Sequence, residues 1–129
     1  MSITCTITAG LPADYTDALD EWQRDALHWT VTLHNSGRYM TVPFFTGSAI
    51  TDPTCADVLE SLLSDAASVY YGPSFEDWAD ELGWDTDSRR VERTYRQIIA
   101  NTDRLRVLLG DAFPSEWDDT EVIARNLCA

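Results

Sequence analysis

The sequence predicts a small α+β domain, in which an antiparallel β-hairpin or three-stranded sheet is packed by three or four helices. Two patterns support this prediction. Apolar and polar residues alternate between residues 28 and 45, as they do in half-buried strands, and beyond residue 52 apolar residues recur at intervals of three and four, as they do in helices. With 129 residues, 44% of them hydrophobic, the chain can bury a core, and we expect residues 1–129 to form one domain.

The first part of the chain is expected to supply the strands. A weak alternation in "ITCTIT" indicates a first strand, and residues 14–25 fit either a short helix or an ordered loop. Trp29, Val31 and Leu33 alternate with polar residues, and "NSGR" then provides the turn of a hairpin. Pro43 lacks an N–H group for a ladder hydrogen bond, so the second hairpin strand is predicted either to lie at a sheet edge or to be irregular near Pro43.

The rest of the chain is expected to be helical. Four helices are predicted to begin at N-caps, which are Asp52 followed by Pro53, Ser74, either Asp87 or Ser88, and Ser115. Glycines are predicted to end the first three of these helices, at Gly72, Gly83 and Gly110. The five tryptophans are interpreted as core and hairpin packing.

Charge is the strongest signal in the composition. The net charge is −13, and residues 1–88 carry all of it, because residues 89–129 contain seven acids and seven arginines. A salt-adapted or GC-rich source also produces lysine-free, Asp-rich sequences, so the total charge alone indicates little. The regional split favours a functional acidic face, which would repel DNA and attract basic partners.

Two acidic segments are the candidate binding surfaces. The first belongs to the predicted helix after Ser74 and the turn that follows it, and comprises Glu76, Asp77, Asp80, Glu81, Asp85 and Asp87. The second comprises Asp14, Asp17, Asp20, Glu21 and Asp25. Carboxylates three and four residues apart on a helix lie about 5–6 Å apart, and the phosphates of a DNA strand repeat on a comparable scale. Such a face could therefore occupy a groove built for DNA, although a solvated helix face is the alternative interpretation.

The arginine-rich stretch 89–106 is the one candidate for direct nucleic-acid binding. Glu92 and Asp103 interrupt it, and the rest of the chain is anionic. We therefore expect these arginines to pair with the protein's own acidic helix, and we expect no direct binding of nucleic acid and no membrane partner.

Sequence motifs for catalysis or cofactor binding are absent, so we expect a protein that is not an enzyme and needs no cofactor or metal. His28 and His34 are six residues apart on one predicted strand, about 20 Å, which is too far to share a metal. Cys5, Cys55 and Cys128 are odd in number and widely spaced, and are interpreted as small buried residues. The N-terminus resembles no signal peptide and no run of apolar residues could span a membrane, so a cytoplasmic location is expected.

Three segments carry a resemblance to a known group of proteins: "HWTVTLHNSGRYMTVPFFTGSA", "TCADVLESLLSDAASV" and "SFEDWADELGWDTDSRRVERTYRQ". In this order they resemble a family of small acidic proteins encoded by bacteriophages and prophages, most of them uncharacterised. The most specific part is the run from Trp84 to Arg90, and the resemblance covers about residues 22–110. The absence of lysine and the acidic segment 14–25 depart from the family pattern. The resemblance implies no catalytic residues.

By analogy with this class, the expected function is inhibition of host defence. The leading hypothesis is an anti-CRISPR DNA mimic in the cytoplasm of the host cell, with the two acidic segments occupying the nucleic-acid groove of a Cas effector complex. One alternative is a phage accessory protein that binds a host or phage protein through its hairpin face. Another is a metal-dependent nuclease or hydrolase that uses clustered carboxylates.

Overall fold

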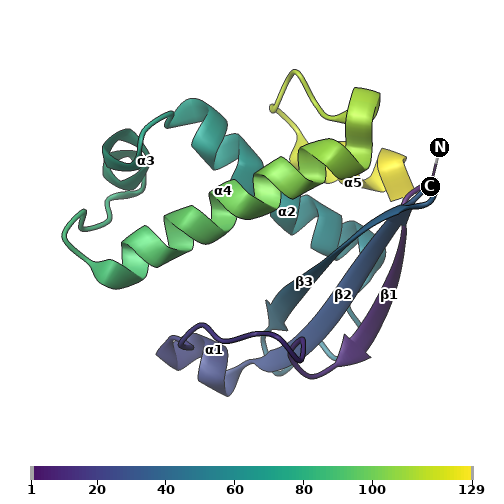
Figure 1. The fold of residues 1–129 in the computed structure, drawn as a ribbon, viewed down its shortest axis with the longest axis horizontal. Helices are drawn as coiled ribbons and strands as arrows, with labels where there is room; N and C mark the ends of the chain where they lie inside the picture. Colours follow the sequence, from purple (N-terminus) through teal and green to yellow (C-terminus); the bar gives the residue numbers. More distant parts are fainter. Residues whose placement is uncertain (1, 129) are drawn as a thin grey trace.

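The computed structural model describes residues 2–128, and it confirms the α+β prediction. Within this range the chain forms one three-stranded antiparallel sheet, in the order β1-β2-β3, and five α-helices (Figure 1). In chain order the elements are β1 Thr4–Ala9, α1 Glu21–Asp25, β2 Leu27–Asn35, β3 Arg38–Thr46, α2 Cys55–Tyr71, α3 Phe75–Leu82, α4 Arg89–Leu109, a 3₁₀ turn Gly110–Ala112, and α5 Thr120–Cys128.

The sheet is a meander whose turn chemistry is visible in the sequence. Ser36 and Gly37 connect β2 to β3 with positive φ angles of 51° and 85°, the combination that a tight two-residue hairpin turn requires. The weak alternation near the N-terminus is confirmed as β1, which pairs with β2. Pro43 lies in β3, an edge strand, as predicted.

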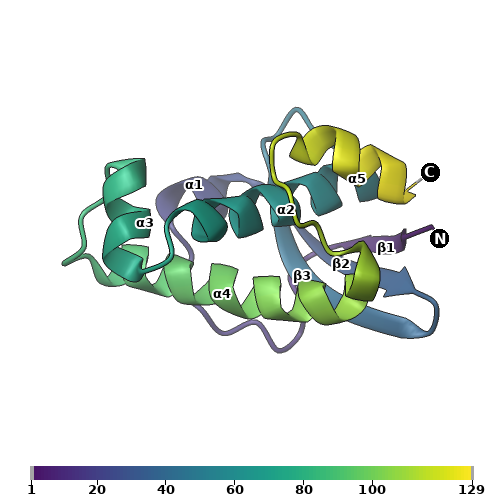
Figure 2. The same cartoon turned by 90° about the horizontal axis from the view of Figure 1, so that it is seen from above.

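The two faces of the sheet differ in polarity. Val31, Leu33, Met40 and Val42 are buried on the inner face, where they belong to the same core cluster as residues of α2 and α4. Figure 2 shows these two helices crossing over one side of the sheet. The opposite, outer face is mainly polar, as the alternation predicts, and its strands carry threonines and two histidines: Thr4, Thr6 and Thr8, His28, Thr30, Thr32 and His34, and Thr41.

Two hydrophobic clusters hold the helices. The larger one joins the sheet to α2, the C-terminal half of α4 and α5, and includes Leu59, Leu63 and Leu105, each 0% exposed. Burying a leucine side chain of this size stabilises the fold by about 1.5–3 kcal/mol. The smaller cluster contains Trp78 and Ala79 of α3 with Val91 and Ile98 of α4. It attaches α3 to the N-terminal half of α4, at the end of the molecule far from the two termini (Figure 1).

The caps of α3 and α4 agree with the sequence. Ser74 Oγ accepts a hydrogen bond from the Asp77 N–H (3.1 Å), and Ser88 Oγ accepts one from the Val91 N–H (3.3 Å). Ser88 rather than Asp87 is therefore the N-cap of α4. Gly83 ends α3 in the left-handed conformation, at φ 71°, where residues with a Cβ atom are disfavoured.

Two predicted helix starts were wrong. The N-cap of α2 is Thr54 and not Asp52, because Thr54 and Asp57 form a reciprocal capping box: the Asp57 N–H donates to Thr54 Oγ1 (3.2 Å) and the Thr54 N–H to Asp57 Oδ2 (2.9 Å). The last helix begins at Thr120 rather than after Ser115. The buried Trp117 ring contacts Tyr70 and Phe113, which holds the preceding segment against the core outside any helix.

Side chains connect the C-terminal half of α4 to the hairpin. The buried Asn35 amide donates to the Leu108 carbonyl (2.8 Å), and Arg38 Nη1 donates to the Val107 carbonyl (3.0 Å). In the other direction, Arg104 Nη2 donates to the Thr41 carbonyl of the edge strand β3 (2.7 Å). These bonds fix α4 along the hairpin.

No helix within residues 2–128 has the length and apolar character needed to cross a membrane. The longest of them, α4, has 21 residues and carries six arginines.

Candidate acidic binding surface

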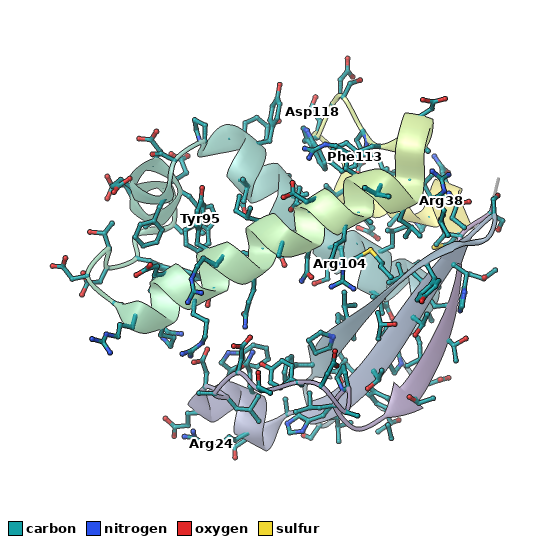
Figure 3. All side chains as sticks on the ribbon, viewed as in Figure 1. Arg24, Arg38, Tyr95, Arg104, Phe113 and Asp118 are labelled. Atoms are coloured by element: carbon teal, nitrogen blue, oxygen red, sulfur yellow. The ribbon has the colours of Figure 1, made fainter. Side chains whose placement is uncertain are left out.

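The first candidate surface forms on α3 and the turn after it. Its six members, which we call the α3 acidic surface, are all exposed: Glu76, Asp77, Asp80, Glu81, Asp85 and Asp87. Figure 3 shows carboxylate oxygens projecting outward around α3. The sequence prediction thus placed these residues correctly on one helix and its following turn.

The opposite side of α3 is firmly packed. Trp78 is 1% exposed and its Nε1–H donates to Ser68 Oγ of α2 (3.0 Å). Its ring also contacts Tyr95 of α4, with 5.2 Å between the ring centroids. Gly72, between α2 and α3, lies so close to Trp78 that a Cβ atom there would come within 2.6 Å of the Trp78 Cα. The carboxylates are therefore carried by a helix whose position is fixed on two sides.

The turn between α3 and α4 is also ordered by local bonds. The Trp84 N–H donates to the Ala79 carbonyl (2.8 Å), and the Asp87 N–H donates to Asp85 Oδ1 (2.9 Å). The Trp84 ring, 39% exposed, packs edge-on against Trp78 at 5.1 Å. Asp85 and Asp87 consequently extend the carboxylate series beyond the end of the helix.

The expected pairing of the arginine helix with α3 was wrong. In the part of the chain that the structure describes, none of the six carboxylates of the α3 acidic surface forms an ion pair with a base. Arg90 and Arg93 instead reach Asp20, with N–O distances of 3.5 Å each. The side chains of α3 that face α4 are aromatic and aliphatic, so this contact leaves the acidic side of α3 pointing to solvent.

The second candidate surface, the N-terminal acidic segment (residues 14–25), has a different character. It is mostly an ordered loop that ends in the short helix α1, which resolves the choice left open by the sequence. Asp20 is only 15% exposed at its side chain, and Asp17 Oδ2 accepts a hydrogen bond from Gln97 Nε2 of α4 (2.6 Å). Two of its five acids therefore attach the segment to α4.

Aromatic contacts hold the same segment on the sheet. Phe45 of β3 meets the rings of Tyr15 and Trp22, at centroid distances of 6.5 and 5.8 Å. Burial, and then the nearby carboxylate of Asp17, raises the pKa of the Tyr15 hydroxyl above its ordinary value. The segment thus crosses the end of the sheet and touches both β3 and α4.

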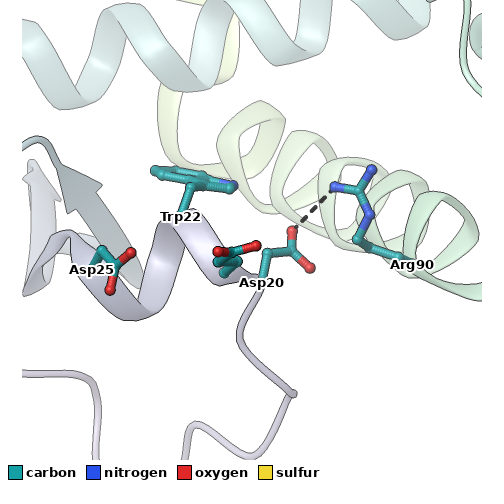
Figure 4. A pocket seen from close by; sticks show the side chains of 5 residues that line it. Asp20, Trp22, Asp25 and Arg90 are labelled. Carbon is teal, nitrogen blue, oxygen red and sulfur yellow. Dashed lines mark hydrogen bonds and ion pairs between the residues drawn. The ribbon is translucent and has the colours of Figure 1, made fainter.

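Three acids of this segment are exposed and form no ion pair within residues 2–128: Asp14, Glu21 and Asp25. Glu21 and Asp25 line an open hollow of about 580 Å³, together with Asp20, Trp22 and Arg90 (Figure 4). Trp22 is 57% exposed there, so its ring packs on the hairpin, through Phe45, and is not part of the core. The sequence signal for its exposure was its position between two acidic residues, Glu21 and Asp25.

Metal ligands are a separate question. Among residues 2–128, no three His, Cys, Asp or Glu side chains are placed so that they could hold a metal ion together. His34 lies exposed on the outer face of the sheet, where its Nε2 is 3.5 Å from Thr6 Oγ1.

Comparison of the chain with protein-family models, with curated proteins and with solved structures found no match.

Proposed function

We propose that this protein is a phage-encoded, non-enzymatic inhibitor of host defence, an anti-CRISPR DNA mimic that occupies the nucleic-acid groove of a Cas effector complex. The α3 acidic surface makes the main contact, and the exposed acids of the N-terminal acidic segment contribute at its edge. The observation that carries the proposal is the combination of six exposed carboxylates, which form no ion pair in the described part of the chain, with a rigid attachment of the helix that presents them.

Charge placement supports this role. A protein that only needed solubility could pair its carboxylates with its own arginines, but Arg90 and Arg93, in the N-terminal part of α4, contact Asp20 instead. Each phosphate-binding lysine or arginine of a partner would meet a carboxylate that forms no ion pair within residues 2–128. Because Trp78 fixes α3 in place, binding a partner costs little backbone entropy at this helix.

Complementary charge also predicts the kinetics. Association between an anionic surface and a cationic groove is accelerated by electrostatic steering, and screening at 0.15 M salt, where the Debye length is about 8 Å, weakens it. Binding should therefore be fast at low salt and fall steeply as salt is added.

The test is capture of purified Cas effector complexes by the protein at low and high salt, with and without competing DNA. The triple variant Asp77→Asn, Asp80→Asn, Glu81→Gln should weaken binding about 10- to 100-fold, since each exposed charge contributes about 0.5–1 kcal/mol. A matched control, Asp52→Asn, Asp111→Asn, Glu116→Gln, removes the same charge from exposed positions elsewhere and should change affinity by less than about threefold. Equal losses in the two variants would mean that only total charge matters.

The alternative is an accessory protein that binds a host or phage partner through the outer face of its hairpin. Tyr39, 72% exposed, is the large hydrophobic residue that favours this candidate. Binding through that face should resist added salt and should be lost in Tyr39→Ala while the α3 triple variant retains it. The salt series in the same capture experiment therefore separates the two candidates.

A further inference from the structure

The three cysteines, distant in sequence, meet at one place in the fold. Cys5 lies in β1, Cys55 is the first residue of α2 and Cys128 is the last residue of α5. All three are free, half-buried thiols that pack against the larger hydrophobic cluster. The sequence interpretation as small buried residues did not predict this convergence, because spacing along the chain carries no information about it.

Cys55 and Cys128 form a close pair. Their sulfur atoms are 3.4 Å apart, with the Cys128 thiol donating to Cys55 Sγ, and the Cys55 thiol in turn points to the Ile3 carbonyl (3.7 Å). The sulfur atoms of a disulfide are about 2.05 Å apart, so the two need to approach by only about 1.4 Å. Both residues are at helix ends, where small backbone adjustments cost least.

We propose that Cys55 and Cys128 form a modification site for two-electron thiol oxidants, which convert the pair into a disulfide that joins the start of α2 to the end of α5. Cys5 stays a thiol. The oxidant is a diazenedicarboxamide, a hydroperoxide or a low-molecular-weight disulfide. With a diazenedicarboxamide, two S–H bonds break and one S–S bond forms, while the two protons and two electrons reduce the N=N bond to a hydrazine.

The surroundings of the pair control its reactivity. Burial, followed by the hydrogen bond to Cys55, raises the pKa of the Cys128 thiol to about 12. The hydrogen bond with Cys5, followed by burial, raises the pKa of Cys55 as well. The attacking species in disulfide formation is the thiolate, so the reaction should be slow at neutral pH and faster as the pH rises. Proximity rather than thiolate character therefore selects this pair.

This inference does not depend on the proposed function. The disulfide would form at the end of α2 that is remote from α3, because α3 follows the C-terminal end of α2. It would tie α5 to α2 and leave the carboxylates of the α3 acidic surface unchanged.

Peptide mapping tests the proposal directly. The native protein is treated with a diazenedicarboxamide at mildly alkaline pH, the remaining thiols are alkylated, and the chain is cleaved after its arginines without reduction. The three cysteines then lie in different peptides, 1–24, 39–89 and 126–129. The expected product has two of the three thiols protected from alkylation, with peptide 39–89 linked to peptide 126–129 and Cys5 alkylated.

Three comparisons make the result decisive. Cys5→Ser, a near-isosteric change, should form the same link, whereas Cys55→Ser and Cys128→Ser should not form it. The same oxidation in concentrated urea gives the pairing of an unfolded chain. A native link between 39–89 and 126–129 that is no more frequent than in urea would overturn the proposal, as would a main product in which Cys5 takes either place.

Discussion

The two acidic regions of this protein have similar composition but opposite relations to its arginines. In the N-terminal acidic segment, Asp20 binds Arg90 and Arg93 and Asp17 binds Gln97, so part of the charge serves to attach the segment to α4. In the α3 acidic surface, apolar contacts attach the helix, and the carboxylates form no ion pair within the described residues 2–128. An acidic run in a sequence therefore does not reveal whether its charge stabilises the fold or is presented to a partner.

The difference arises from which atoms make the attachment. The side of α3 that faces α4 offers Phe75 and Trp78, so no carboxylate is required for docking. In the N-terminal acidic segment, by contrast, the carboxylates of Asp17 and Asp20 make polar contacts with α4. Substitutions that weaken one mode of attachment and spare the other test this difference between the two regions.

The largest effect is expected from Trp78→Ala. This change removes a buried ring that contacts Phe75, Trp84 and Tyr95, and should lower the free energy of unfolding by about 3–5 kcal/mol. The matched control is Trp22→Ala in the other region, where the ring is 57% exposed and the loss should stay below about 1.5 kcal/mol. Denaturant unfolding of both variants measures the difference, and equal losses would contradict the contrast between the regions.

The next effect concerns the cap of α3. Ser74→Ala removes the acceptor for the Asp77 N–H and should cost about 1 kcal/mol, whereas Ser74→Asp should retain most of the stability because aspartate also caps helices. Hydrogen exchange of the first α3 amides, with the amides of α1 as the internal reference, should show faster exchange only in α3. Faster exchange in both places would indicate that the two regions unfold together.

A comparable or smaller loss is expected from Asp20→Asn. The carboxylate is mostly buried and contacts two arginines, but both distances are 3.5 Å and Arg90 is largely exposed, so we expect about 0.5–1 kcal/mol. Asp80→Asn, which removes an unpaired carboxylate, should leave the free energy of unfolding unchanged within about 0.5 kcal/mol. If Asp80→Asn were the more destabilising of the two, the conclusion that Asp20 stabilises the fold and Asp80 does not would be wrong.

The smallest effect should appear in the salt dependence of stability. Unpaired carboxylates on α3 repel one another, so added salt should stabilise the native protein slightly. The triple variant Asp77→Asn, Asp80→Asn, Glu81→Gln should lose a few tenths of a kcal/mol of this salt response. Thermal unfolding at low and moderate salt measures this salt response. If the triple variant were stabilised by salt as much as the original protein, the repulsion would lie elsewhere on the surface.

Local chemistry explains which parts of the fold could be predicted. The hairpin follows from alternation and from Ser36-Gly37, and the boundaries of α3 follow from Ser74 and Gly83, because each of these signals acts over a few residues. The predicted start of α2 was wrong because two N-cap signals, Asp52-Pro53 and the capping box of Thr54 and Asp57, lie within six residues of each other. The capping box prevails, since both of its hydrogen bonds form. The prediction that Trp117 lies in a helix was wrong. Its ring is held by contacts with Tyr70 and Phe113, and sequence periodicity does not show such contacts.

The candidate site was predictable only in part for the same reason. The exposed series on α3 follows from helical spacing, but the partner of Arg90 lies 70 residues earlier in the chain. Nothing local distinguishes Asp20 from Asp80 before the loop is placed against α4. Long-range contacts therefore decide which acids remain free, and they also bring Cys55 and Cys128 together.

The contact between Arg104 and β3 has a consequence for self-association. An edge strand offers backbone groups on which a strand of another molecule can add, and hairpins with an open edge are prone to aggregate by this route. Here a strand that approaches β3 would compete with the Arg104 guanidinium for the Thr41 carbonyl, and it would bring its own backbone close to the fixed positive charge of α4. Helix α4, which supports the hairpin, thus also hinders the addition of another strand to β3.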